Sequence, residues 1–142
     1  MPVYPTVSVP RLHTEYHLWI SEITFFSEEI KIFESHLQKM ISKDISPSNL
    51  KCIEQFRANF NDKKEVINQL KWNLHQAEKG LTSFVHQMSG MGLCCVKMDN
   101  HCLLREEVHL FKKDFTKLKI EFRAFEVRCL FQKNTEAICP VY

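Results

Sequence analysis

The side chains best suited to chemistry are concentrated in one short stretch, residues 86–102. It holds two histidines, three methionines and three cysteines: His86, Met88, Met91, Cys94, Cys95, Met98, His101 and Cys102. Copper(I) and zinc accept thiolate ligands, copper(I) also accepts thioethers, and a loop can wrap such groups around an ion. The cysteines lack the Cys-x-x-Cys spacing of zinc sites, and Met88 and His101 fall where a helix buries its side chains. A soft-metal (copper or zinc) site is therefore the alternative function, and an apolar loop over one end of a helical domain is the simpler interpretation.

Two Glu and His pairs have the three-residue spacing found in metal-binding helix bundles. A di-iron site needs two Glu-x-x-His motifs and two further glutamates, all pointing inward. Glu106 and His109 follow that order, but both lie off the apolar side of their segment. His75 and Glu78 have the reverse order and are interpreted as ordinary surface residues. We therefore assign no metal ligand and no cofactor to the chain.

The sequence does not favour an enzyme. Nucleophilic catalysis needs a cysteine or serine, a histidine and an acid that converge in a pocket. His101 and Cys102 are neighbours, but adjacent residues on a helix point about 100° apart and do not meet. A phosphate-binding Gly-x-x-x-x-Gly-Lys motif is also missing from the sequence. We predict a non-enzymatic protein with no small-molecule substrate and no catalytic residue.

The near-neutral charge balance does not favour binding to nucleic acid or to a membrane surface. The 142 residues include 19 basic and 17 acidic side chains, for a formal charge of +2. Basic residues are frequent near the end of the chain, but acidic residues are interleaved with them, as on an ordinary solvated helix face. The sequence contains no apolar run of the ~20 residues that a membrane-spanning helix needs. Nucleic acid is therefore an unlikely partner, and we predict no membrane association.

The first residues and the cysteines favour a cytoplasmic location. The start, MPVYPTVSVP, has no basic stretch followed by an apolar core and a cleavage site, so it does not resemble a secretory signal. The six cysteines are then expected to be reduced thiols rather than a disulfide framework.

Proline and glycine divide the chain into three long segments that must position all of these side chains. Ser46 followed by Pro47 is a strong helix start, because proline at the first helical position wastes no backbone donor. The predicted elements are a flexible N-terminal arm at 1–11, helices at about 12–43, 47–88 and 100–133, and a C-terminal tail at 134–142.

Apolar residues in each segment recur at alternating steps of three and four, which is the heptad spacing of coiled-coil helices. The first seam runs through Leu12, Tyr16, Trp19, Ile23, Phe26, Ile30, Phe33, Leu37 and Met40. The second runs through Ile53, Phe56, Phe60, Lys63, Ile67, Leu70, Leu74, Ala77, Leu81, Phe84 and Met88. The third runs through His101, Leu104, Val108, Phe111, Phe115, Leu118, Phe122, Phe125 and Cys129. The predicted fold is all-α: an antiparallel up-down-up bundle of three long helices with coiled-coil packing.

Charged residues beside the seams predict how the helices pair. Arg57, Lys64 and Lys71 in the second segment are placed to face Glu22 and Glu29 of the first segment, if these two helices run side by side. Such pairs contribute only about 0.3–0.5 kcal/mol each, so they select the register more than they stabilise the fold.

Much of the chain resembles a family of short, uncharacterised helical proteins of Bacteroidetes bacteria. The resemblance covers about residues 16–131 and is carried by WISEITFFSEEIKIFESHL, KEVINQLKWNLHQAEKGL and DNHCLLREEVHLFKKDFTKLKIEFRAF. It implies a bundle of long helices and no assigned activity. The Cys- and Met-rich connection differs from the more aliphatic loop of that family.

A second set of apolar residues lies outside the seams. On the first segment Leu18, Phe25 and Ile32 repeat every seven residues, and on the third segment Ile120, Val127 and Phe131 form a similar row with Ala124. They either widen the core beneath the N-terminal arm or form a surface for self-association or for a partner helix. Trp72 projects from the outer side of the second segment. We predict a structural or protein–protein interaction module, with a homodimer as one form of it.

Overall fold

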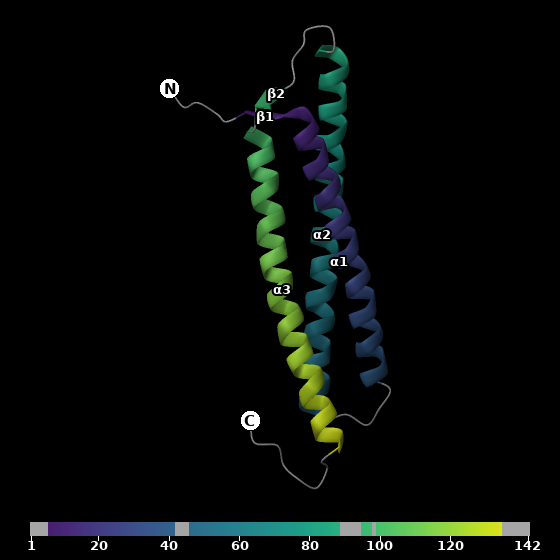
Figure 1. Cartoon of the computed structure of the whole chain (residues 1–142). Coiled ribbons are helices and arrows are strands. Elements are labelled where there is room, and N and C mark those ends of the chain that lie inside the picture. Colours follow the sequence, from purple (N-terminus) through teal and green to yellow (C-terminus); the bar gives the residue numbers. More distant parts are fainter. Residues whose placement is uncertain (1–5, 42–45, 89–94, 98, 135–142) are drawn as a thin grey trace.

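The chain forms an all-α fold built on long helices. The computed structural model describes residues 6–41, 46–88, 95–97 and 99–134. Within these ranges the elements, in chain order, are β1 (Thr6–Ser8), α1 (Val9–Ile41), α2 (Pro47–Met88), β2 (Cys95–Lys97) and α3 (Asp99–Asn134). Figure 1 shows the three helices lying lengthwise beside one another, with α1 and α3 beginning at the same end and α2 beginning at the opposite end. None of the helices in the described ranges is apolar over a stretch long enough to cross a membrane.

The helix starts follow local capping chemistry. Ser46 caps α2, because its Oγ accepts a hydrogen bond from the backbone N–H of Asn49 at 3.3 Å. The predicted bounds of this helix, 47–88, match the observed ones. Similarly, Ser8 Oγ accepts the N–H of Arg11 at 3.3 Å at the start of α1. Pro10 fits this first turn, so α1 begins at Val9, within the segment assigned to the flexible arm.

At the predicted boundaries of α3 the observed helix differs by one residue at each end, and the predicted end of α1 at residue 43 lies outside the described residues. Helix α1 is described as far as Ile41, and α3 extends from Asp99 to Asn134 rather than from 100 to 133. Of the predicted arm and tail, residues 1–5 and 135–142 lie outside the described residues.

A short antiparallel sheet joins the beginning of the chain to the connection before α3. Its register pairs Thr6 with Lys97, Val7 with Val96 and Ser8 with Cys95. The sequence predicts neither strand, because three residues are too few to show a periodic pattern. The pairing of 6–8 is therefore a correction to the flexible arm. It ties the starts of α1 and α3 together (Figure 1).

The core consists of the predicted seams. Most of the described seam residues are buried, and the partly buried ones are Phe26, Met40, Phe56, Lys63, Ala77, Phe84 and Cys129. Toward the ends of α1 and α3, the rings of Phe33, Phe60 and Phe122 contact one another with centroids 5.2–5.6 Å apart. Burying one phenylalanine contributes about 1.5–3 kcal/mol, so this aromatic layer is a large part of the fold's stability.

A row of polar contacts, three of them ion pairs and one a histidine–carboxylate contact, joins α1 to α3 at every seventh residue. The pairs are Glu15–Arg105 at 2.9 Å, Glu22–Lys112 at 2.6 Å, Glu29–Lys119 at 3.2 Å and His36–Glu126 at 3.0 Å. Each partner in α3 is numbered 90 higher than its partner in α1. We call these four pairs the α1–α3 ladder.

The ladder corrects the predicted charge pairing. Glu22 and Glu29 contact α3 and not the lysines of α2. Lys64 of α2 instead contacts Glu34, with Nζ 2.7 Å from Oε2. The prediction failed because charged residues lie along both sides of an apolar seam. The sequence does not show which of the two neighbouring helices lies on each side.

Candidate functional site

The residues predicted to form an interaction surface are all exposed to solvent. Leu18, Phe25 and Ile32 on α1 have 55–60% of their surface exposed. On α3, Ile120, Val127 and Phe131 are 52–65% exposed. The alternative role, widening the core, would require a cover over these rows. Among the described residues of the N-terminal segment, Val9 packs against the core, whereas these six residues each keep more than half of their surface exposed.

Helix α3 exposes more apolar side chains than the sequence interpretation included. Leu103 and Leu110 are seven residues apart, and Leu130 lies beside Phe131; all three are between 49% and 65% exposed. Each of the three lies directly beside a seam residue. The same seven-residue count that found Ile120 and Val127 could have found them, because Leu103 and Leu110 repeat at that spacing.

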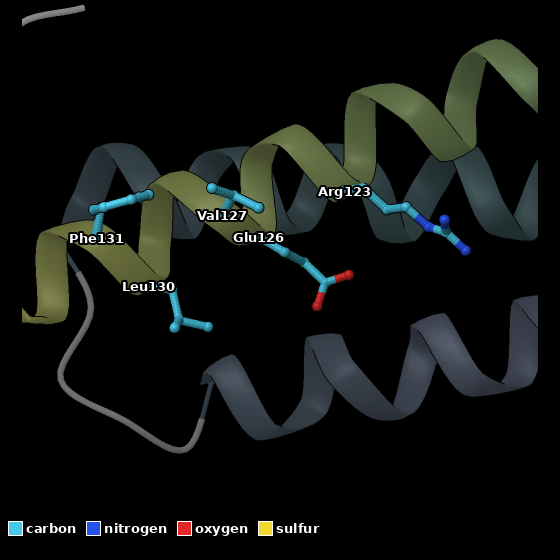
Figure 2. A pocket seen from close by; sticks show the side chains of 5 residues that line it. All are labelled: Arg123, Glu126, Val127, Leu130 and Phe131. Carbon is cyan, nitrogen blue, oxygen red and sulfur yellow. The ribbon is translucent and has the colours of Figure 1, made fainter.

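One end of this α3 row borders a cavity of about 390 Å³. Figure 2 shows its lining side chains, Arg123, Glu126, Val127, Leu130 and Phe131, with Glu126 and Leu130 extending toward α1. Glu126 also takes part in the α1–α3 ladder. The cavity thus combines apolar walls with a charged edge, which suits an apolar side chain flanked by a polar group.

At the opposite end of the ladder, His101 is a buried polar residue within the aromatic core. Its ring stacks on Trp19 with centroids 5.2 Å apart and meets the edge of Tyr16 at 5.4 Å. His101 Nε2 lies 3.1 Å from Glu15 Oε2, and Arg105 donates to the same carboxylate. Arg105 Nη2 is also 3.1 Å from Nε2, so this nitrogen either donates to the carboxylate or accepts from the guanidinium, depending on the tautomer. Nδ1 is buried without a hydrogen-bond partner among the described residues.

The surroundings of His101 favour its neutral form. Burial lowers the pKa of His101 below 6.5; the nearby Arg105 lowers it further, while Glu15 opposes the shift. For Glu15, burial alone would raise the pKa of the carboxyl. The hydrogen bond and charge of Arg105, together with His101, outweigh that effect and bring the pKa below 4.5.

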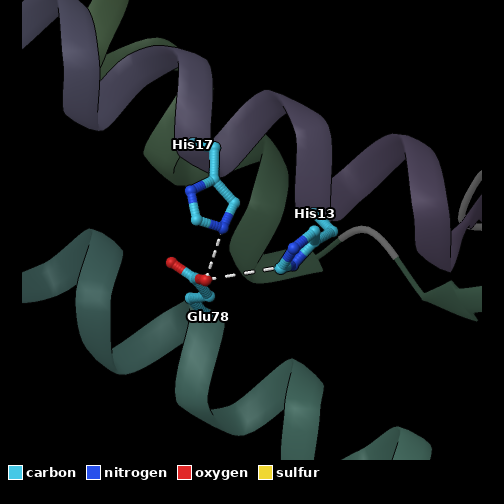
Figure 3. A group of neighbouring side chains, drawn as sticks. All are labelled: His13, His17 and Glu78. Carbon is cyan, nitrogen blue, oxygen red and sulfur yellow. Dashed lines mark ion pairs between the residues drawn. The ribbon is translucent and has the colours of Figure 1, made fainter.

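A second histidine cluster lies between α1 and α2. His13 and His17 project from successive turns of α1 toward Glu78 of α2 (Figure 3). His17 Nε2 is 2.7 Å from Glu78 Oε1, and His13 Nδ1 is 3.9 Å from the same oxygen. One potential ligand atom from each of the three side chains lies within 4.8 Å of the other two.

This cluster corrects the interpretation of Glu78 as an ordinary surface residue. The sequence signal was the four-residue spacing of His13 and His17, which places both rings on one face of a helix. It was missed because the third member comes from another helix. His75 is exposed and is not part of the cluster. Glu106 and His109 are both exposed as well.

The Cys- and Met-rich stretch 86–102 is only partly described. Residues 89–94 and 98 lie outside the described residues, so a soft-metal site there stays a prediction. Met88 ends α2, and Cys102 is an exposed free thiol on the first turn of α3. His101 belongs to the core and to the Glu15 cluster, which removes it from the set of readily available ligands.

The described residues thus define an all-α protein of three long helices with an exposed apolar face and two histidine–carboxylate clusters. Comparison with known protein families, curated proteins and solved structures finds no match to this chain.

Proposed function

We propose that the protein is a non-enzymatic helical module that acts by binding another helix, in a second copy of itself or in a partner protein. The observation that carries this proposal is the pair of exposed apolar rows, Leu18, Phe25 and Ile32 on α1 and Ile120, Val127 and Phe131 on α3. Large apolar patches on a protein surface usually mark sites of interaction. The α1 row repeats every seven residues and the α3 row has steps of seven and four, so each row can pack lengthwise along another helix.

The proposal includes an antiparallel up-down-up coiled-coil bundle as the scaffold. Two sets of contacts support this arrangement. Along the α1–α3 ladder the residue numbers rise together on both helices. Between α1 and α2 they change in opposite directions, since His17 contacts Glu78 whereas Glu34 contacts Lys64. Burial of the heptad positions supports coiled-coil packing of the seams.

We place this module in the cytoplasm and in the family of Bacteroidetes helical proteins as further parts of the proposal. Free thiols at Cys52, Cys102 and Cys129 in the described part of the chain suit a reducing compartment. The near-balanced charge suits a protein partner better than nucleic acid. Soft-metal binding by the 86–102 connection is the alternative function.

Self-association is tested by sedimentation velocity of the full chain from low to high micromolar concentration under reducing conditions. We expect a dimer that the double substitution Phe25→Ser/Ile32→Ser converts to a monomer. Trp72→Ser is the matched control, because Trp72 is equally exposed but lies on α2. Circular dichroism checks that both variants keep their helices.

A wild-type protein that is monomeric throughout this range would rule out the homodimer. The partner form of the proposal is then tested by placing a photo-crosslinking amino acid at position 25 or at position 72 in cells. Equal crosslinking from both positions would contradict a role for the α1 row.

A further inference from the structure

We propose that His13, His17 and Glu78 bind a first-row divalent transition-metal ion such as zinc, which bridges α1 and α2. This site is separate from the apolar rows and does not depend on the proposed function. It also differs from the predicted soft-metal stretch, because its ligands are two imidazoles and a carboxylate rather than sulfurs.

The spacing of the ligands fits a small ion. In a tetrahedral zinc site with bonds of about 2.0–2.2 Å, neighbouring ligand atoms lie roughly 3.3 Å apart. The observed distances from Glu78 Oε1 are 2.7 Å to His17 Nε2 and 3.9 Å to His13 Nδ1, on either side of that value. The two rings also touch edge to face, with centroids 4.4 Å apart. Small side-chain rotations would therefore place all three ligand atoms around one ion.

The local environment allows an ion to enter. The side chains of His13 and His17 are 52% and 57% exposed, so their rings can turn and solvent can reach them. The Glu78 side chain is only 20% exposed and is held between the helices. Three protein ligands leave a fourth position for water or for a group from another molecule.

The ligand types determine which ions the site would accept. Two imidazoles and a carboxylate suit zinc, cobalt, nickel and copper(II), whereas magnesium and calcium prefer sites made only of oxygen. Because the ligands come from both helices, a bound ion would join the second and third turns of α1 to the last part of α2. Metal binding would then stabilise the folded chain by mass action.

The test uses the reduced full-length protein, stripped of metal with a chelator and titrated with zinc chloride in a calorimeter. We expect one ion per chain at this site, with affinity at least tenfold weaker in His17→Ala and in Glu78→Gln. His109→Ala is the matched control, since His109 is an exposed histidine outside the cluster. Zinc should also raise the melting temperature of the wild type but not that of His17→Ala.

Cobalt(II) separates this site from the cysteines, because thiolate ligands give cobalt a strong near-ultraviolet charge-transfer band that imidazole and carboxylate ligands lack. We expect the wild type to bind one cobalt ion that does not give this band. The double variant His13→Ala/His17→Ala should lose that ion. The proposal is overturned if the wild type binds no zinc, or if the double variant binds zinc and cobalt as the wild type does. If the wild type and the double variant both bind only an ion that gives the thiolate band, metal binding belongs to the cysteines. The proposal is then overturned as well.

Discussion

His101 shows how a single buried side chain links the fold to pH. Its Nε2 meets Glu15 while Nδ1 has no partner among the described residues. The protonated ring carries an N–H at both nitrogens, so Nδ1–H is buried without a partner in the described part of the chain. Nε2–H then faces the donor Arg105, and a positive charge lies close to Arg105 and Arg11. An unpaired buried donor costs about 1–3 kcal/mol, so the neutral ring is the form that suits the fold.

The stability of the protein should therefore fall in mild acid. The pKa of His101 is lowered by folding, so the unfolded chain binds its proton first as the pH drops below about 6.5. The Glu15 carboxyl adds a second loss below about pH 4.5, because its pKa is also lowered. Urea unfolding at pH 8, 6 and 5 measures this, and His101→Leu should flatten the slope between pH 6.5 and 5. One proton changes stability by at most about 1.4 kcal/mol per pH unit. An unchanged slope in His101→Leu would contradict the assignment.

The aromatic layer predicts the largest single-residue effect on stability. Phe122 is completely buried and touches Phe33, Phe56 and Phe60. Phe122→Ala should lower the free energy of unfolding by about 3–5 kcal/mol, because it removes apolar contacts and leaves a cavity. Trp72→Ala, at an exposed position, should change it by no more than about 0.5 kcal/mol. Chemical denaturation of both variants decides this, and equal losses would contradict the assignment of the core.

At the scale of the elements, the α1–α3 ladder fixes how two helices align. The backbones of α1 and α3 lie farther apart than those of α1 and α2, and long side chains span the distance. Lys119 both contacts Glu29 and lies over the rings of Phe26 and Phe115, at 5.7 and 5.4 Å. The ladder is thus the polar edge of an aromatic contact, and shifting α3 by one residue would separate every pair in it.

Reversing one ladder pair tests this role. Lys119→Glu places two carboxylates together and should destabilise the protein by about 1 kcal/mol, since both side chains are mostly buried. Adding Glu29→Lys should recover part of the loss, and added salt should reduce the difference between single and double variants. Thermal unfolding at low and high salt measures both effects. Complete independence of the two substitutions would show that this pair does not help to align the helices.

At the scale of the whole molecule, local and repeated patterns were predictable and tertiary contacts were not. Heptad spacing identified the core because burial repeats with the helix turn, and the Ser46 cap located the start of α2. The same count placed Phe25 and its companions in the α1 row outside the seams but left open whether other residues cover them. Their exposure of 55–60% is known only from the structure. The two short strands carry no repeat, so the arm was predicted to be unpaired.

The histidine clusters show the same limit for function. His13 and His17 have a visible helical spacing, but their acidic partner Glu78 lies about 60 positions away on another helix. His101 fell on a seam position, which predicted burial, but its contact with Glu15 depends on the register of α1 against α3. The histidine–carboxylate contacts of this chain form only when the helices align. No single segment of the sequence encodes that alignment.

The constant offset of 90 positions in the ladder also bears on the order of assembly. Each ladder pair between the first and third helices closes a loop of that length, and the strand pairing at their starts closes loops of about the same length. The first two helices, joined through residues 42–45, can meet as soon as both have been synthesised. Contacts between distant parts of a chain form more slowly than local ones. We therefore expect the third helix to dock last, so that the aromatic surface that it covers is open to other molecules until then.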